Sequence, residues 1–108
     1  MNMKEIKICI AGLGNVGSSV VQSLIDSKNF INLKSNLNIN ILGISAKNKN
    51  KKRIFDINKY KWFDNPLEFL NTDCDIIIEL IGEEKGLSYD LVKSSLEKGK
   101  HVITANKA

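Results

Sequence analysis

A glycine-rich segment near the N-terminus constrains the fold of this chain more than any other feature. Residues 12–17 read GLGNVG and match the pattern GxGxxG. They follow Lys4 to Gly12, which first alternates and then becomes small and apolar, as a strand entering a buried parallel sheet does. From Asn15 the apolar residues fall four and five positions apart, which predicts an amphipathic helix that ends near Ser27 to Asn29. Its stripe is Val16, Val20, Val21, Leu24 and Ile25.

Each glycine of this segment has a physical role if it binds a dinucleotide. Gly12 allows a tight turn, Gly14 leaves room for a pyrophosphate against the backbone, and Gly17 lets the helix pack close to the strand. Free N–H groups at the start of the helix then face the phosphates. A glycine-rich turn without a ligand is the alternative, but the flanking strand and helix favour the dinucleotide site. The predicted phosphate-binding residues are Gly12, Leu13, Gly14, Asn15, Val16 and Gly17.

The rest of the chain continues to alternate between strands and helices. Further strands are predicted at Ile39 to Ser45, Tyr60 to Phe63, Asp75 to Gly82 and His101 to Thr104. A helix of about two turns is predicted after the capping residue Asn65 and Pro66. Another helix carries the stripe Leu87, Leu91, Val92, Ser95 and Leu96 and ends in a left-handed cap at Lys98 and Gly99. The basic segment Lys47 to Arg53 is predicted to be an exposed loop.

This alternation predicts an α/β fold. Right-handed crossovers between parallel strands give a doubly wound, mostly parallel sheet of the Rossmann type, with strand order 3-2-1-4-5. No repeat or low-complexity linker divides the 108 residues, so we expect one NAD(P)-binding domain over residues 1–108. The chain stops at Ala108, directly after a predicted strand, where such folds continue into another helix. We therefore expect a fragment of a longer enzyme whose substrate domain is absent from this chain.

The end of the second predicted strand bears on which dinucleotide is bound. A site for NAD places an acid there, which accepts hydrogen bonds from the ribose hydroxyls. Here Ile44, Ser45, Ala46 and Lys47 offer no acid, and further cations follow. A lysine beside a small polar residue suits a 2′-phosphate, which favours NADP over NAD. The alternative is that Lys47 belongs to a solvated lysine loop.

Two other predicted strand ends reach the same crevice, because ligands of open α/β sheets bind beyond the carboxyl ends of the strands. After one strand, Ile81 and Gly82 allow the backbone to approach the cofactor. After the last strand, Thr104, Asn106 and Lys107 place a hydroxyl, an amide and an ammonium near the nicotinamide and its ribose. A chance polar loop is the alternative interpretation of these residues.

Other reactive side chains are predicted to be structural. Glu79 lies inside an apolar strand and is expected to pair with a backbone donor or a cation rather than to act in catalysis. Cys9 and Cys74 have neither CxxC spacing nor a nearby histidine, so we expect buried reduced thiols and no metal site. Asp73 and Asp75 flank the start of a strand and are interpreted as turn residues.

Charge and hydropathy exclude two classes of partner. The formal net charge is +4, but five positive charges lie between Lys47 and Arg53 without interleaved aromatic residues, so no nucleic acid is expected as a partner. The apolar runs are far shorter than the roughly 18 residues of a membrane span. The N-terminus also lacks the cleavage site of a signal peptide. We therefore expect a cytoplasmic protein that does not bind membranes.

The sequence resembles a known family, the N-terminal nucleotide-binding domain of homoserine dehydrogenase. The resemblance lies in IAGLGNVGSSVV, ISAK, YKWFDNP, DCDIIIELIG and GKHVITANKA, and ELIG followed by GKHVITANKA is the most specific part. It implies that the phosphate-binding loop is Gly12 to Gly17, that Lys47 is the 2′-phosphate cation and that Lys107 is the nicotinamide-side lysine. Glu83 departs from the family pattern, in which a second glycine is usual.

The resemblance also implies a reaction. Homoserine dehydrogenases interconvert L-homoserine and L-aspartate 4-semialdehyde with NAD(P), on the route to threonine, methionine and isoleucine, and we expect a homo-oligomer for the full-length enzyme. Lys107 is the expected catalytic residue of this chain, with an ammonium that stabilises charge on the substrate oxygen. The fragment alone should bind cofactor without turnover. A nucleotide-sensing regulatory module with the same fold is the alternative, although the ending TANKA favours the enzyme.

Overall fold

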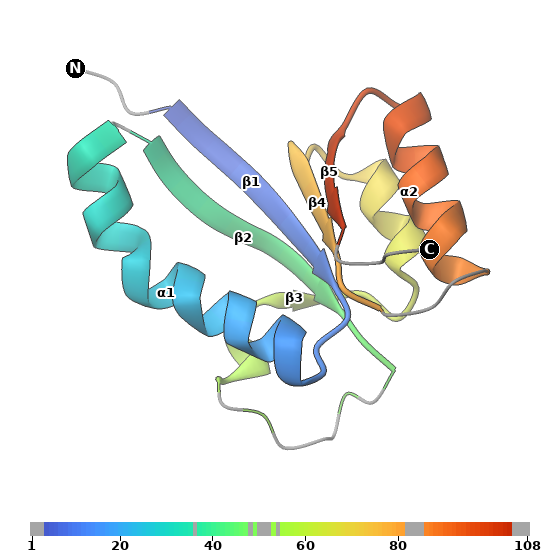
Figure 1. The fold of residues 1–108 in the computed structure, drawn as a ribbon, viewed down its shortest axis with the longest axis horizontal. Coiled ribbons are helices and arrows are strands. Elements are labelled where there is room, and N and C mark those ends of the chain that lie inside the picture. Colours follow the sequence, from blue (N-terminus) through green and yellow to red (C-terminus); the bar gives the residue numbers. More distant parts are fainter. Residues whose placement is uncertain are drawn as a thin grey trace.

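The described part of the chain forms five strands, two α-helices and two short 3-10 helices (Figure 1). The structure is a computed structural model that describes residues 4–35, 37–47, 49, 53, 55–81 and 86–104. Its strands are β1 (Lys4–Ala11), β2 (Leu37–Ser45), β3 (Lys61–Trp62), β4 (Ile76–Glu79) and β5 (His101–Thr104). Its helices are α1 (Asn15–Ser35), α2 (Leu87–Glu97) and the 3-10 helices η1 (Ile57–Lys59) and η2 (Pro66–Asn71).

The strands form one parallel sheet in the order β3-β2-β1-β4-β5. The central strand β1 pairs with β2 up to Ala11 opposite Ser45, and with β4 up to Ala11 opposite Glu79. The strand order therefore reverses beside β1, and the carboxyl ends of β2 and β4 flank the point of reversal. These findings confirm the predicted fold class and strand order.

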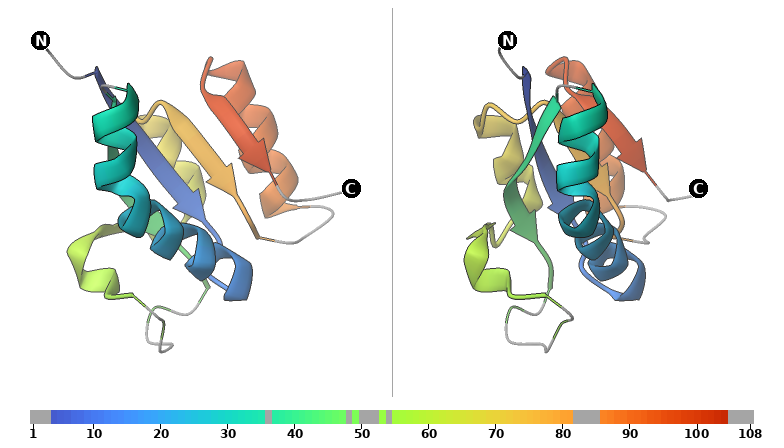
Figure 2. Two further views of the ribbon diagram at one scale, coloured as in Figure 1. Left: turned by 60° about the vertical axis from the view of Figure 1, so that its left-hand side comes forward. Right: turned by 90° about the vertical axis from the view of Figure 1, so that its left-hand side faces the viewer.

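Apolar side chains cover both faces of the sheet. Cys9 of β1 packs with Phe69 of η2 and Leu91 of α2, while the next residue, Ile10, packs on the opposite face with Val21 of α1. In the left view of Figure 2, α1 lies in front of the sheet and η2 and α2 lie behind it. The alternation of side chains along a strand produces these two layers.

The length of α1 differs most from the sequence prediction. The helix was expected to end near Ser27 to Asn29, but it continues to Ser35. The Asn- and Lys-rich composition after Lys28 suggested a connection, yet no glycine or proline lies between Ser18 and Leu42 to end the helix. Neither α1 nor any other helix of the described ranges is both long and apolar enough to cross a membrane.

Strand β4 is shorter than predicted, ending at Glu79 rather than continuing to Gly82, which lies outside the described residues. The Leu80 N–H still donates to the Ala11 carbonyl at 2.8 Å. The next N–H, of Ile81, instead donates to the Glu79 carboxylate at 2.7 Å. The chain leaves the sheet here because the Glu79 side chain, and not a strand carbonyl, accepts the hydrogen bond from the Ile81 N–H.

Both predicted helix caps are confirmed. The Asn65 side chain accepts a hydrogen bond of 3.0 Å from the Leu67 N–H, and Pro66 is the first residue of η2, whose two turns are of the 3-10 type. At the end of α2, Gly99 has a φ of +77° and its N–H donates to the Leu96 carbonyl at 3.0 Å. These caps fix the two helices that cover one face of the sheet.

The two cysteines lie together in the core. Both are buried, as predicted, and no disulfide joins them. Cys9 belongs to β1 and Cys74 precedes β4, so their spacing in the sequence did not indicate that they meet. The hydrogen bond with Cys74 and burial raise the pKa of the Cys9 thiol, which therefore stays protonated.

Candidate functional site

Gly12 and Gly17 are glycines that the fold itself requires. Gly12 has a φ of +99°, and a Cβ there would lie 2.6 Å from the carbonyl group of Leu80. A Cβ at Gly17 would lie 1.9 Å from the carbonyl oxygen of Gly12. Neither position has room for a side chain, so these residues let the start of α1 pack directly against the end of β1.

Gly14 lies between them and is different. It is exposed, and apart from its two chain neighbours a Cβ at this position would meet no atom of the described residues within 4 Å. The packing of the chain therefore does not explain a glycine here. The space in front of Gly14 belongs to a cleft, where a bound group can approach the backbone.

Hydrogen bonds to β2 and α1 hold the loop between β1 and α1. The Gly12 N–H donates to the carbonyl of Ser45, at the end of β2, over 2.8 Å. The Ser18 N–H donates to the Gly14 carbonyl at 2.8 Å, and the buried Ser18 hydroxyl donates to the Leu13 carbonyl at 3.0 Å. The carbonyl groups of Leu13 and Gly14 therefore already accept hydrogen bonds from Ser18. The N–H groups in the first turn of α1 have no intrahelical acceptor and form the positive end of the helix dipole, which favours anions.

A cleft of about 330 Å³ opens beside this loop, at the carboxyl ends of the strands. Its volume falls in the range of small-molecule sites. Its walls come from the loop, the ends of β2 and β4, the segment after β3 and the start of α2. The lining residues are Gly12, Leu13, Gly14, Ser45, Ala46, Lys47, Arg53, Asp64, Pro66, Leu80, Ile81 and Leu87.

Two cations line the cleft on the side of β2. Lys47 follows the end of β2 and is exposed, as predicted for a residue of the basic loop. Arg53 corrects that prediction, because it is half-buried rather than exposed. Its Nε donates to the Leu13 carbonyl at 3.4 Å, and its guanidinium lies 5.6 Å from the centre of the Trp62 ring. These contacts hold Arg53 against Leu13 and Trp62, in the wall of the cleft.

A carboxylate also lines the cleft. Asp64 follows β3, and the Trp62 indole donates a hydrogen bond of 3.1 Å to its Oδ1. The cleft therefore contains charges of both signs at the ends of β2 and β3.

Glu79 is completely buried at the end of β4 and acts as a structural acceptor. One carboxylate oxygen accepts from the Ile81 N–H at 2.7 Å, and the other accepts from the Thr104 hydroxyl at 2.6 Å. The expected pairing with a backbone donor is confirmed. Through these two bonds Glu79 joins the ends of β4 and β5 and fixes Ile81 in the cleft wall.

The structure brings together only part of the predicted set. Gly12, Leu13, Gly14, Lys47 and Ile81 line the cleft, whereas Gly17 packs behind it and the Thr104 hydroxyl is bonded to Glu79. Asn15 and Val16 begin α1, as the motif predicts. Gly82, Asn106 and Lys107 lie outside the described residues.

Sequence reasoning missed several lining residues, of which Arg53 and Asp64 are the charged ones. Arg53 had been grouped with the solvated cations of its loop. Asp64 was not assigned a role. For Asp64 the available signal was the short aromatic strand around Trp62, since a strand end in an open α/β sheet opens towards the ligand crevice. No such signal indicated Arg53.

Comparisons with known proteins agree with this geometry. Residues 12–108 match the family described as homoserine dehydrogenase, NAD binding domain. The homoserine dehydrogenases of Pseudomonas aeruginosa and Bacillus subtilis are 33% and 34% identical to the chain over 116 and 112 residues. Those alignments cover 98% and 97% of this chain but 24% of each relative, so the chain spans about a quarter of their length.

The structural comparison gives the same result. A crystal structure of S. aureus homoserine dehydrogenase superposes with a TM-score of 0.90 and 37% identity, covering 98% of this chain and 27% of that chain. The structure from Thiobacillus denitrificans gives a TM-score of 0.80 at 27% identity. Sequence and fold therefore agree over nearly the whole chain. It belongs to the homoserine dehydrogenase family, within which it corresponds to the NAD-binding domain.

Proposed function

We propose that this chain binds a nicotinamide dinucleotide in the cleft, as the cofactor domain of an enzyme that interconverts L-homoserine and L-aspartate 4-semialdehyde. The observation that carries this proposal is the difference among the three glycines of the loop. Gly12 and Gly17 are required by packing, but Gly14 faces open space at the positive end of α1. A pyrophosphate against Gly14 accounts for a glycine that the fold does not need.

The charges at the end of β2 support a preference for NADP over NAD. A 2′-phosphate carries nearly two negative charges at neutral pH. Lys47 lines the cleft where the adenosine ribose would lie, and Arg53 lines the same wall. No acid follows β2 directly, so the ribose hydroxyls lack the acceptor that NAD sites provide there. Asp64 opposes the cations, which makes the proposed preference severalfold rather than absolute.

Calorimetric titration of the chain with NADPH and NADH tests this proposal, using Lys47→Glu as the variant. We expect the substitution to weaken NADPH binding about fivefold or more, because an attraction becomes a repulsion. NADH binding should stay the same or improve if the new carboxylate reaches the ribose hydroxyls. The effect on NADPH should decrease at higher ionic strength.

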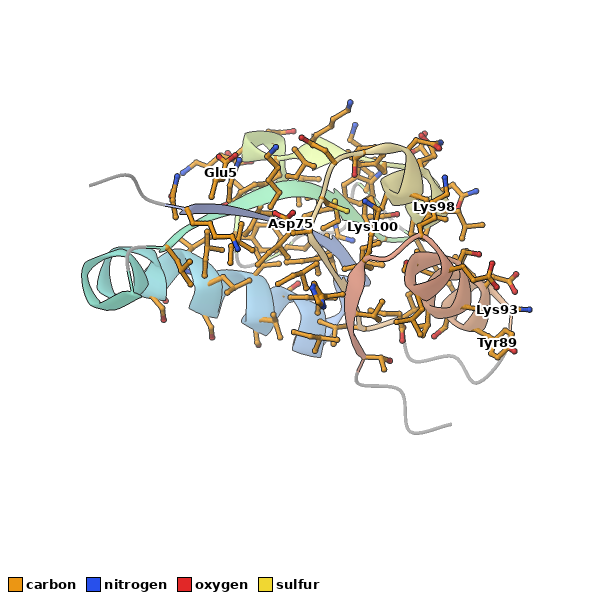
Figure 3. The ribbon with its side chains drawn as sticks, turned by 90° about the horizontal axis from the view of Figure 1, so that it is seen from above. Glu5, Asp75, Tyr89, Lys93, Lys98 and Lys100 are labelled. Atoms are coloured by element: carbon orange, nitrogen blue, oxygen red, sulfur yellow. The ribbon has the colours of Figure 1, made fainter. Side chains whose placement is uncertain are left out.

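Lys93→Glu provides a matched control with the same change of charge. Lys93 lies on the outer side of α2 and is exposed (Figure 3), so both affinities should remain unchanged. If the ratio of NADPH to NADH affinity is the same in the parent chain and in Lys47→Glu, the preference for NADP has to be withdrawn. If neither dinucleotide binds the folded parent chain, the proposed function itself fails.

The chemical step is proposed for the whole enzyme. Lys107 would place an ammonium beyond β5, where it stabilises the negative charge that develops on the carbonyl oxygen of the semialdehyde as its carbon accepts hydride. Because hydride transfer needs the substrate held against the cofactor by a further domain, the chain alone should bind without turnover. The whole protein is further proposed to act as a homo-oligomer. Steady-state kinetics of Lys107→Ala in the whole enzyme test the lysine, and unchanged kcat would exclude its role.

A further inference from the structure

Asp64 is a carboxylate in the cleft wall that the proposed function leaves without a role. Its Oδ1 accepts the hydrogen bond from the Trp62 indole, which fixes the orientation of the side chain. Its Oδ2 has no hydrogen-bond partner among the residues that the structure describes. Asp64 therefore brings to the cleft wall an oriented carboxylate with one occupied oxygen and one oxygen without a partner among the described residues.

The order of the strands places Asp64 at the far end of a bound dinucleotide. The glycine loop follows β1, Lys47 follows β2 and Asp64 follows β3, and these strands are neighbours in that order. The Phe63 N–H donates to the Ile44 carbonyl at 2.9 Å, so Asp64 lies beside the end of β2. Neighbouring strands are about 4.8 Å apart, so each step along the sheet advances by that distance. A dinucleotide with its pyrophosphate at β1 and its ribose at β2 brings its purine base to β3.

The negative charge of the Asp64 carboxylate determines which group of the dinucleotide it can bind. A negative side chain repels the 2′-phosphate, and the ribose hydroxyls are one strand closer to the loop. The base edge of adenine offers a hydrogen-bond donor, its exocyclic amino group. Pro66, two residues after Asp64, lines the same cleft, and its apolar ring suits the flat face of the base.

We infer that Asp64 accepts a hydrogen bond from the exocyclic amino group of adenine and so selects adenine dinucleotides over those with a 6-oxo purine. This inference rests on the proposed function, because it assumes that the dinucleotide occupies the cleft. It adds a specificity-determining residue for the base. Trp62 acts as the positioning residue, since it holds the carboxylate through Oδ1 and leaves Oδ2 for the ligand.

The test compares NADH with reduced nicotinamide hypoxanthine dinucleotide, in which an oxo group replaces the amino group. Calorimetric titration of the purified chain with each ligand gives the ratio of the two affinities. We expect the parent chain to bind NADH about fivefold more tightly, because the carboxylate gains a charge-assisted hydrogen bond from the amino group and faces a carbonyl oxygen in the analogue.

Asp64→Asn should bring the two affinities to within about twofold of each other. The asparagine amide keeps an oxygen for the Trp62 indole, and its NH₂ can donate to the 6-oxo group of the analogue. Glu68→Gln is the control, because it removes the same charge from an exposed residue of η2 that does not line the cleft. In this control the affinity ratio should equal that of the parent chain.

The outcomes separate this inference from the proposal on which it rests. If the parent chain binds NADH and the hypoxanthine analogue equally well, or if Asp64→Asn leaves the ratio unchanged, the role of Asp64 is overturned while dinucleotide binding stands. If neither ligand binds the folded parent chain, the proposed function fails and the inference fails with it. A ratio that falls in Asp64→Asn and not in Glu68→Gln supports the assignment.

Discussion

The two ends of the parallel sheet carry the same kinds of charged side chain in different arrangements. At the amino end, the Lys7 ammonium pairs with Asp73, and the Lys7 N–H donates to the Asp75 carboxylate at 2.8 Å. At the same end Lys100 donates to the carbonyls of Thr72 and Cys74, at 3.0 and 2.9 Å. Figure 3 looks onto this end, with Asp75 and Lys100 near its centre. At the carboxyl end, charged side chains instead surround an open cleft.

This difference separates charged residues that stabilise the fold from charged residues that can act on a bound ligand. The charges at the amino end find their partners within the chain, so removing one of them alters the folded state. The cleft charges Lys47 and Asp64 border a volume that a ligand can fill, so changing one of them alters affinity. Open α/β sheets bind ligands at the carboxyl ends of their strands, which is the end where this chain leaves space.

The largest effect is expected for Gly17→Val, a substitution at the carboxyl end that should act on stability. Its Cβ would lie 1.9 Å from the Gly12 carbonyl oxygen, so α1 must move away from β1. We expect a loss of about 3 kcal/mol or more in the free energy of unfolding, and a fall of about 10 °C or more in Tm. Thermal unfolding followed by circular dichroism measures this change. A variant with the parent Tm would contradict the close packing of the loop.

Glu79→Leu should have the next largest effect, because Glu79 is a structural residue at the carboxyl end. Leucine leaves the Ile81 N–H without its carboxylate acceptor and removes the hydrogen bond from Thr104 to residue 79, at a cost of about 1–3 kcal/mol. Glu79→Gln is the matched control, because its amide oxygen can accept from Ile81 while its NH₂ donates to Thr104. Urea unfolding of the two variants distinguishes them. Equal stability for leucine and glutamine would show that these bonds contribute nothing.

The smallest effect is expected for Asp73→Asn at the amino end. The hydrogen bond from Lys7 lowers the pKa of the Asp73 carboxyl below its ordinary value of 3.8, and the same contact raises the pKa of Lys7. A carboxyl whose pKa is lowered on folding stabilises the protein above its ordinary pKa and loses this contribution as the pH falls through its folded-state pKa.

The parent chain should therefore have a slightly higher Tm than Asp73→Asn near neutral pH, and the difference should shrink as the pH falls below about 4 and disappear once the pH is below the lowered folded-state pKa of Asp73. The pair is exposed, so the difference is small and decreases with salt. NADPH affinity should be the same for both proteins. A changed affinity would break the division between the two ends of the sheet.

Local patterns were sufficient to predict the parts of the molecule that are contiguous in sequence. The strand, the turn and the helix around Gly12 to Gly17 follow one another directly, and each has a clear periodicity. The caps at Asn65 and Gly99 depend on neighbouring residues and were also predicted. The end of α1 was not, because composition suggested a connection where no glycine or proline stops the helix.

The missed parts of the site depend on contacts between distant segments. Arg53 reaches the cleft because its guanidinium lies against Trp62 and meets the Leu13 carbonyl, forty residues away in the sequence. Asp64 reaches it because the two-residue strand β3 pairs beside β2. Neither placement follows from a local pattern. To predict them, one must know the order of the strands and the direction of the side chains on the edge strand.

The central claim is that the space in front of Gly14 holds the pyrophosphate, and calorimetric titration of Gly14→Val with NADPH tests it most directly. Because a Cβ at Gly14 meets no atom of the described residues within 4 Å beyond its chain neighbours, the variant should remain folded, which circular dichroism checks. We predict that it no longer binds NADPH, since the valine side chain occupies the space that the phosphates need. A folded Gly14→Val chain that binds NADPH as tightly as the parent would contradict the claim.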